Sequence, residues 1–163
     1  MVYLAEVTTP PAIYTAAAPM LTKLAVTKGL VYKFHLYAPH GAMGLHYVQV
    51  FDGSYQLWPS SPGKAFRGDG IQIDWDDIYL KSVEPYEFTI KSWNLDDTYE
   101  HLTVIAVGMV SEEAFMARFL PSMSWENAVK AMADIQARQI EQQQAIIAQP
   151  FAWLPPSSEI GEE

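Results

Sequence analysis

Apolar and polar residues alternate along much of the chain, most clearly between residues 86 and 110. In the first half of this segment, charged or hydroxyl side chains alternate with the apolar residues Tyr86, Phe88 and Ile90. Alternation with a period of two gives a strand one buried face and one wetter face. After a turn sequence at residues 94–97, residues 102–110 are almost wholly apolar, which is typical of a strand covered on both faces. The pattern predicts a long hairpin at the centre of a β-sheet.

Shorter segments of the same character come at close spacing before this hairpin. They are separated by the turn sequences Lys28-Gly29 and Asp52-Gly53 and by a long Pro- and Gly-rich loop at residues 59–70. Short strands joined by Gly, Pro and Asp turns predict a mainly β, antiparallel, jelly-roll-like β-sandwich rather than alternating β and α units. The expected strands cover residues 21–27, 30–38, 45–51, 55–58, 71–75 and 78–80, and residues 1–7 could form a further short strand.

The pattern changes to a helical period after residue 110. Residues 112–119 predict a short helix, and residues 125–149 predict a longer C-terminal α-helix that Ser124 would cap. The longer helix has a thin apolar stripe, with Ala133, Ile140 and Ile147 at seven-residue spacing and glutamines between them. A stripe of this kind suits a helix bundled with other subunits, or one that lies on its own sandwich through Trp125, Val129 and Met132.

Both ends of the chain are rich in proline. Residues 8–19 predict an extended arm with Ile13 and Tyr14 as apolar anchors, or else a disordered terminus. Residues 150–163 predict an extended tail, which would dock in a partner or fold back on its own domain through Phe151, Trp153 and Leu154. The expected organisation is therefore an arm at residues 1–20, a sandwich at 21–110, a helical segment at 111–149 and a tail at 150–163.

Composition narrows the classes of partner. The formal charge of −9 argues against nucleic acid, which needs clustered Lys and Arg, and against an anionic membrane surface. No stretch approaches the roughly 20 apolar residues of a membrane span. The chain has no cysteine, so disulfides, thiolate metal sites and a cysteine nucleophile are excluded.

Candidate chemistry is sparse. His40, His46 and His101 could hold a metal with a carboxylate, but no two of them lie an even number of residues apart within a single predicted strand, so ordinary strand histidines are the better interpretation. The aspartates at positions 69, 74, 76, 77, 96 and 97 suit turns better than a calcium loop. No hydrolase elbow, phosphate-binding loop or zinc-protease helix is present. We therefore expect no cofactor and no catalytic residue.

Three functions fit this pattern. A cysteine-free sandwich whose extended termini carry apolar anchors suggests a homo-oligomeric structural subunit of a larger assembly. In general style it resembles the capsid-decorating or jelly-roll coat proteins of a virion, and a virion is the location we favour. The expected partner-binding residues are Ile13, Tyr14, Ile140, Ile147, Phe151, Trp153 and Leu154. One alternative is a carbohydrate-binding module that stacks sugar rings on aromatic side chains, although packing is the commoner role of such residues. The candidates are Trp58, Trp75 and Trp93, with Tyr47, Tyr55, Tyr79 and Tyr99. The other alternative is a small metal-dependent β-sandwich enzyme.

Overall fold

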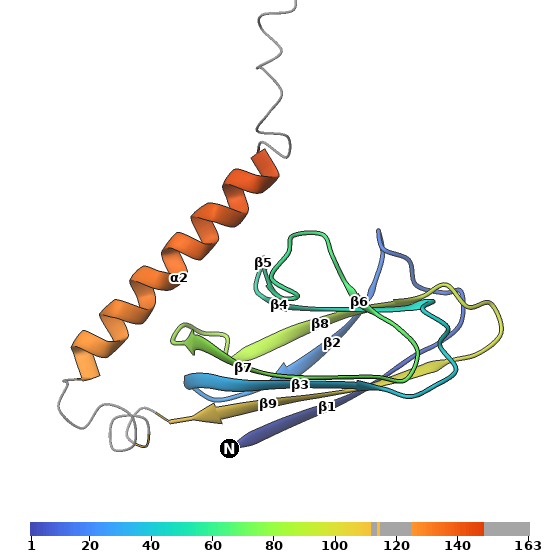
Figure 1. Ribbon diagram of the computed structural model, residues 1–163, viewed down its shortest axis with the longest axis horizontal. Helices are drawn as coiled ribbons and strands as arrows, with labels where there is room; N and C mark the ends of the chain where they lie inside the picture. The colour runs from blue at the N-terminus through green and yellow to red at the C-terminus, as the bar shows by residue number, and fades with distance from the viewer. Residues whose placement is uncertain (112–113, 115–124, 149–163) are drawn as a thin grey trace, which may run out of the picture.

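The computed structural model describes residues 1–111, 114 and 125–148. They form two antiparallel β-sheets packed face to face, with one long helix outside them (Figure 1). This confirms the prediction of a mainly β sandwich with a C-terminal helix. The elements are β1 Val2–Thr9, β2 Met20–Ala25, β3 Gly29–Ala38, β4 His46–Asp52, β5 Tyr55–Trp58, β6 Phe66–Arg67, β7 Ile71–Lys81, β8 Glu87–Asn94, β9 His101–Val110 and α2 Trp125–Ala148.

The strand order is that of a jelly roll. One sheet has the order β1-β9-β3-β7, and the other has the order β2-β8-β4-β5, with the short β6 paired to β4. When β6 is set aside, the pairs β1–β9, β2–β8, β3–β7 and β4–β5 are nested along the chain, and all are antiparallel. Successive pairs alternate between the two sheets, as in a rolled ribbon of eight strands.

The predicted hairpin at residues 86–110 is wrong. β8 pairs with β2 and β4, whereas β9 pairs with β1 and β3, so the two strands lie in different sheets. The alternation of apolar and polar residues shows which side chains of a strand are buried. It does not show which strand is its neighbour, because strands of both sheets turn one face toward the same core. β9 is also not covered on both faces, since Leu102 is exposed on its outer side. The predicted short hairpin between residues 45–51 and 55–58 is confirmed as the β4–β5 pair.

Two other boundaries differ from expectation. The short strand considered at residues 1–7 is present as β1, residues 2–9, which pairs with β9 along its whole length, so the expected arm at 1–20 is reduced to the connection 10–19. Residues 71–75 and 78–80 are one continuous strand, β7. The short helix expected at residues 112–119 lies outside the described residues except for Ala114.

Aromatic residues fill the centre of the sandwich. Phe34, Trp58 and Phe88 are essentially inaccessible to solvent, and the rings of Phe34 and Trp58 lie 4.3 Å apart between centroids. Trp75 stacks on the other side of Phe34 at 4.7 Å. Truncation of such a buried aromatic side chain typically costs about 3–5 kcal/mol. These contacts join the two sheets through one shared core.

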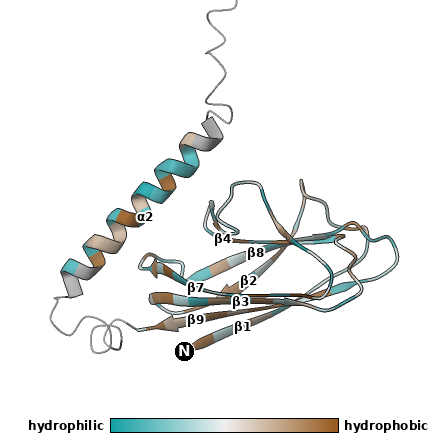
Figure 2. Ribbon diagram, in the orientation of Figure 1, coloured by the Kyte–Doolittle hydropathy of each residue, from teal (hydrophilic) through white to brown (hydrophobic). Residues whose placement is uncertain are grey.

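The helix α2 covers one side of the sandwich, where β7 and β5 are the edge strands of their sheets (Figure 1). Val129 and Met132 pack against Leu30 and Leu80. Beyond them the contacts are polar, and α2 carries hydrophilic and hydrophobic residues interspersed along its length (Figure 2). These contacts agree with the expectation that Val129 and Met132 pack α2 on its own sandwich.

Glutamines make those polar contacts with strand backbone. The Gln136 amide donates to the Leu80 carbonyl at 3.1 Å, and the Gln143 amide donates to the carbonyls of Gln56 at 2.9 Å and Ser60 at 3.0 Å. An edge strand presents unpaired backbone groups that invite pairing with another chain, and proteins often cover such edges with a helix. The glutamines of the thin stripe therefore serve to dock α2 on two sheet edges.

Candidate interaction surface at the loop end

Four connections meet at one end of the sandwich, at the right in Figure 1. They are residues 10–19 between β1 and β2, 39–45 between β3 and β4, 68–70 between β6 and β7, and 95–100 between β8 and β9. We call this region the loop end. It contains or lies next to His40, His46, His101 and Ile13, which are four of the residues singled out in the sequence.

A buried polar layer lies directly beneath these loops. The ring of His46 on β4 contacts the hydroxyl of Thr9 through Nε2 at 3.0 Å and the hydroxyl of Thr103 through Nδ1 at 3.1 Å. The Thr9 hydroxyl donates in turn to Ser92 Oγ at 2.8 Å. Since that donation leaves Thr9 only as an acceptor toward His46, the network fits a neutral imidazole with its proton on Nε2. The layer links strands of both sheets.

Burial holds His46 in the neutral form. The pKa of His46 is lowered to about 4, chiefly by burial and to a smaller extent by the neighbouring His101. The two rings lie 6.0 Å apart between centroids. A base with so low a pKa would be mostly deprotonated at neutral pH, but both rings are almost wholly shielded from solvent. Both rings therefore lie beneath the surface, where they contribute hydrogen bonds to the buried layer.

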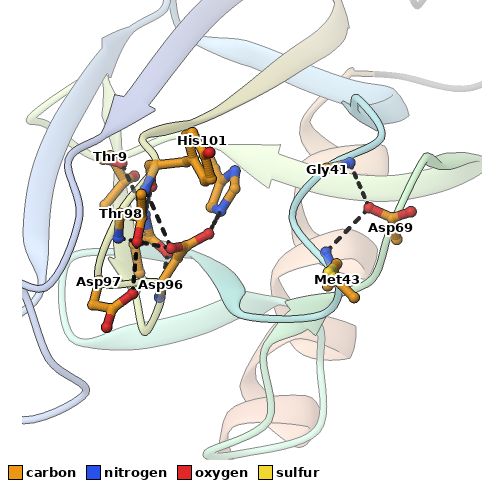
Figure 3. A network of polar contacts seen from close by, with 10 residues as sticks. Thr9, Gly41, Met43, Asp69, Asp96, Asp97, Thr98 and His101 are labelled. Carbon is orange, nitrogen blue, oxygen red and sulfur yellow. Dashed lines mark hydrogen bonds and ion pairs between the residues drawn. The ribbon is translucent and has the colours of Figure 1, made fainter.

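The turn from β8 to β9 is organised around Asp96 (Figure 3). Its Oδ1 accepts from the backbone amides of Thr98 at 2.8 Å and Tyr99 at 3.2 Å, and its Oδ2 lies 3.0 Å from His101 Nε2. These amides, with His101, lower the pKa of Asp96 below its ordinary value. Asn94, wholly buried, donates to the Tyr99 carbonyl at 2.8 Å. Hydrogen bonds between residues of the turn and of the adjoining strands therefore hold its conformation.

A second aspartate fixes the β3–β4 loop (Figure 3). Asp69 Oδ1 accepts from the amides of Gly41 at 2.6 Å and Met43 at 3.1 Å, and Oδ2 lies 3.2 Å from His40 Nδ1. These donors lower the pKa of Asp69 to about 2, with the two backbone amides as the main cause. The carboxylate therefore remains charged and bonded across the neutral pH range.

Backbone hydrogen bonds join the loops to one another. The Ala12 amide donates to the Asp96 carbonyl at 3.0 Å, and the Leu95 amide donates to the Leu45 carbonyl at 2.9 Å. The first bond joins the β1–β2 loop to the β8–β9 turn, and the second joins that turn to the β3–β4 loop. The three loops consequently form one connected surface rather than three independent tips.

Apolar side chains project from this connected surface. Met43 is 81% exposed, and four further residues from the same three loops are also exposed: Ile13, Leu45, Leu95 and Tyr99. Two residues of the surface, Ala12 and Met43, have left-handed backbone with φ of 50° and 47°. Left-handed backbone is unfavourable for residues with a Cβ atom, and strain of this kind tends to cluster at functional sites.

The histidines expected as weak metal candidates do not come together as a set of three. His46 and His101 are neighbours, whereas His40 is exposed and bonded to Asp69. Within the described part of the chain, no three His, Asp or Glu side chains are grouped as metal ligands would be.

The expected partner-binding residues have mixed outcomes. Ile13 is exposed at the loop end and Tyr14 beside it is half-buried, while Ile140 is exposed on α2. The side chain of Ile147, and all of Phe151, Trp153 and Leu154, lie outside the described residues.

Sequence reasoning missed the other apolar residues of the loop end. Their only signal is that the apolar residues Met43, Leu45 and Leu95 occur beside the Pro, Gly and Asp residues that are typical of loops. Of the aromatic residues considered for sugar stacking, Tyr99 is exposed at the loop end, whereas the three tryptophans take part in packing. Trp58 and Trp93 are buried, and Trp75 packs against Phe34.

None of the helices in the described residues is long and apolar enough to cross a membrane. Comparison of the sequence with protein-family models finds no match, and comparison with curated proteins likewise finds none.

Proposed function

We propose that this protein is a non-enzymatic structural subunit that associates with copies of itself in a larger assembly. Within that class, we favour a capsid, decoration or other surface protein of a virus particle. The jelly-roll strand order supports the narrower proposal by analogy, because viral capsid proteins use this architecture. Lectins and cupins share it, so the fold carries less weight than the surface.

The loop end is the observation that carries the proposal. Scattered exposed apolar residues are common on proteins, but a cluster from three mutually bonded loops is typical of an interaction surface. The loops are already ordered by Asp69 and Asp96, so docking would cost little conformational entropy. The left-handed backbone at Met43 keeps a large apolar side chain at a position where glycine would be easier.

The chemistry of the region also favours contact over catalysis. His46 and His101 are the groups best suited to acid–base work, and both are nearly inaccessible beneath the loops. What the region offers to solvent is mainly apolar side chains, together with His40 and carboxylates. A surface of this composition suits burial against another protein.

The absence of cysteine permits a direct test. Single cysteines introduced as Met43→Cys and, as a control, Val83→Cys would be labelled with a maleimide at low and high protein concentration. Val83 is also strongly exposed but lies between β7 and β8, at the opposite end of the sandwich. We expect labelling of Met43→Cys to slow on assembly while Val83→Cys is unaffected. Equal labelling rates at both positions in the assembled state would contradict the proposal.

A further inference from the structure

An apolar groove runs between α2 and β7, away from the loop end. Its volume is about 690 Å³, which lies within the range of about 300–1,000 Å³ typical of ligand pockets. Leu30, Leu80 and Met132 line it, and Ile78 from β7 and Ile135 from α2 remain largely exposed at its margins. Exposed apolar patches that form a groove of this size are often interaction or ligand-binding sites.

The charged residues among those that line the groove are all acidic. Asp76 and Asp77 of β7 belong to its lining, and none of the described lining residues is basic. Asp77 is held in place because its Oδ2 accepts from Trp58 Nε1 at 2.6 Å and its Oδ1 accepts from the Ile78 amide at 2.7 Å. Lys33 lies beside the groove but is engaged by Asp74 at 3.1 Å and Asp76 at 3.7 Å. The lining therefore favours a cationic ligand.

The third feature is the amide chemistry of the helix wall. Gln136 and Gln139 line the groove, and Gln136 already donates to a backbone carbonyl, that of Leu80. Glutamine side chains carry both a donor and an acceptor, so they can bond to the backbone of an incoming peptide as they do to the sheet edge. Apolar lining, acidic margin and amide side chains together match an amphipathic peptide better than a purely apolar small molecule.

We propose that this groove binds a peptide segment of a partner protein, with apolar side chains in the groove and a lysine or arginine beside Asp76 and Asp77. The site is separate from the loop end and does not depend on the structural role proposed above. A partner could use it whether or not the subunit associates with itself, so either proposal can fail alone.

The test uses the full chain and two short fluorescent peptides. One peptide alternates leucine and lysine, and its matched control has glutamate at each lysine position. We expect the lysine peptide to bind with a fluorescence-polarisation signal that weakens with added salt, because exposed charge pairs are screened. The glutamate peptide should not bind.

Matched variants distinguish the groove from general attraction to an acidic protein. Asp76→Asn should weaken binding of the lysine peptide about two- to fivefold, the range of exposed ion pairs. Glu100→Gln, which changes the net charge equally at the loop end, should not. Ile135→Gln should weaken binding by about fivefold or more through lost apolar contact, whereas Ile140→Gln on the same helix should have no effect. Circular dichroism verifies that each variant is folded.

Three results would overturn the proposal: no binding of the lysine peptide by the folded chain, equal binding of the glutamate peptide, or equal weakening by the groove variants and their controls. The third result would show that the peptide is attracted to the overall negative charge.

Discussion

The rings of His46 and His101 lie 6.0 Å apart although they come from opposite sheets of the sandwich. His46 is fixed by two threonine hydroxyls and His101 by the Asp96 carboxylate. Two titratable rings are thus built into the layer that supports the loop end. Protonation of this layer should affect the stability of the whole fold.

The first prediction concerns acid sensitivity. The folded-state pKa of His46 is about 4, below the ordinary value of 6.5, so the unfolded chain binds a proton more readily. Stability should therefore be unaffected by this group above pH 6.5 and should fall between pH 6.5 and 4. The shift corresponds to about 3 kcal/mol at most. Urea unfolding at several pH values measures the slope.

The variant His46→Gln isolates this effect, because glutamine can still bond to the two hydroxyls but does not titrate. We expect it to be less stable than the wild type at pH 7.5 and to lose less stability between pH 6.5 and 4. Asp96 adds acid sensitivity at lower pH in both proteins, since its carboxylate form is favoured by folding. An unchanged slope in His46→Gln would show that other groups cause the acid sensitivity.

The second prediction concerns the attachment of α2. Gln143 is almost wholly buried and donates to two edge carbonyls, so Gln143→Ala should loosen the helix by about 1–2 kcal/mol. The readout is faster amide hydrogen exchange in α2 with little change in the core strands. Gln144→Ala is the control, because Gln144 is exposed on the same turn. Equal effects of the two variants would mean that these bonds do not hold the helix.

A third prediction concerns a buried cation at the end of the sandwich opposite the loop end. Lys81 is almost inaccessible and pairs with Asp52, which also accepts from the Tyr79 hydroxyl at 2.7 Å. Burial and this carboxylate raise the pKa of Tyr79 above its ordinary value. Asp52→Ala should cost about 3–5 kcal/mol because it leaves a buried charge uncompensated.

The neutral replacement Lys81→Met should cost clearly less than Asp52→Ala, since Asp52 retains its bond to Tyr79 and some contact with solvent. The double variant should be more stable than Asp52→Ala alone. Chemical denaturation of the three variants forms a double-mutant cycle. A double variant less stable than Asp52→Ala would show that the pair is not coupled as described.

The sequence predicted which segments are strands better than how they pair. Alternation located β8, but the assignment of β9 to the same hairpin was wrong, because in a jelly roll most consecutive strands lie in opposite sheets. The residues 8–19, interpreted as an arm, are instead the end of β1 and its connection to β2. Pairing of β1 with β9 joins residues about a hundred positions apart, and no local pattern contains that information.

The polar layer beneath the loop end had a readable signal that the sequence analysis did not use. In β1, Thr9 follows Ala5 and Val7 in the series of alternate residues that face the core. In β8, Ser92 follows Phe88 and Ile90 in the same way. A small polar residue in phase with buried ones indicates a hydrogen-bonded interior site. The partners across the two sheets could not be predicted in the same way, since they depend on the strand order.

Sedimentation velocity of the full-length protein over a range of concentrations tests the central claim, self-association through the loop end. The decisive variant is Met43→Gly, which removes the most exposed apolar side chain of that surface and relieves its left-handed backbone. We predict that the wild type and Val83→Gln form the same oligomer. Met43→Gly should dissociate more readily while melting at the same or a higher temperature. A wild type that stays monomeric throughout would contradict the account. So would an oligomer weakened by Leu4→Gln, on the outer face of β1, but not by Met43→Gly.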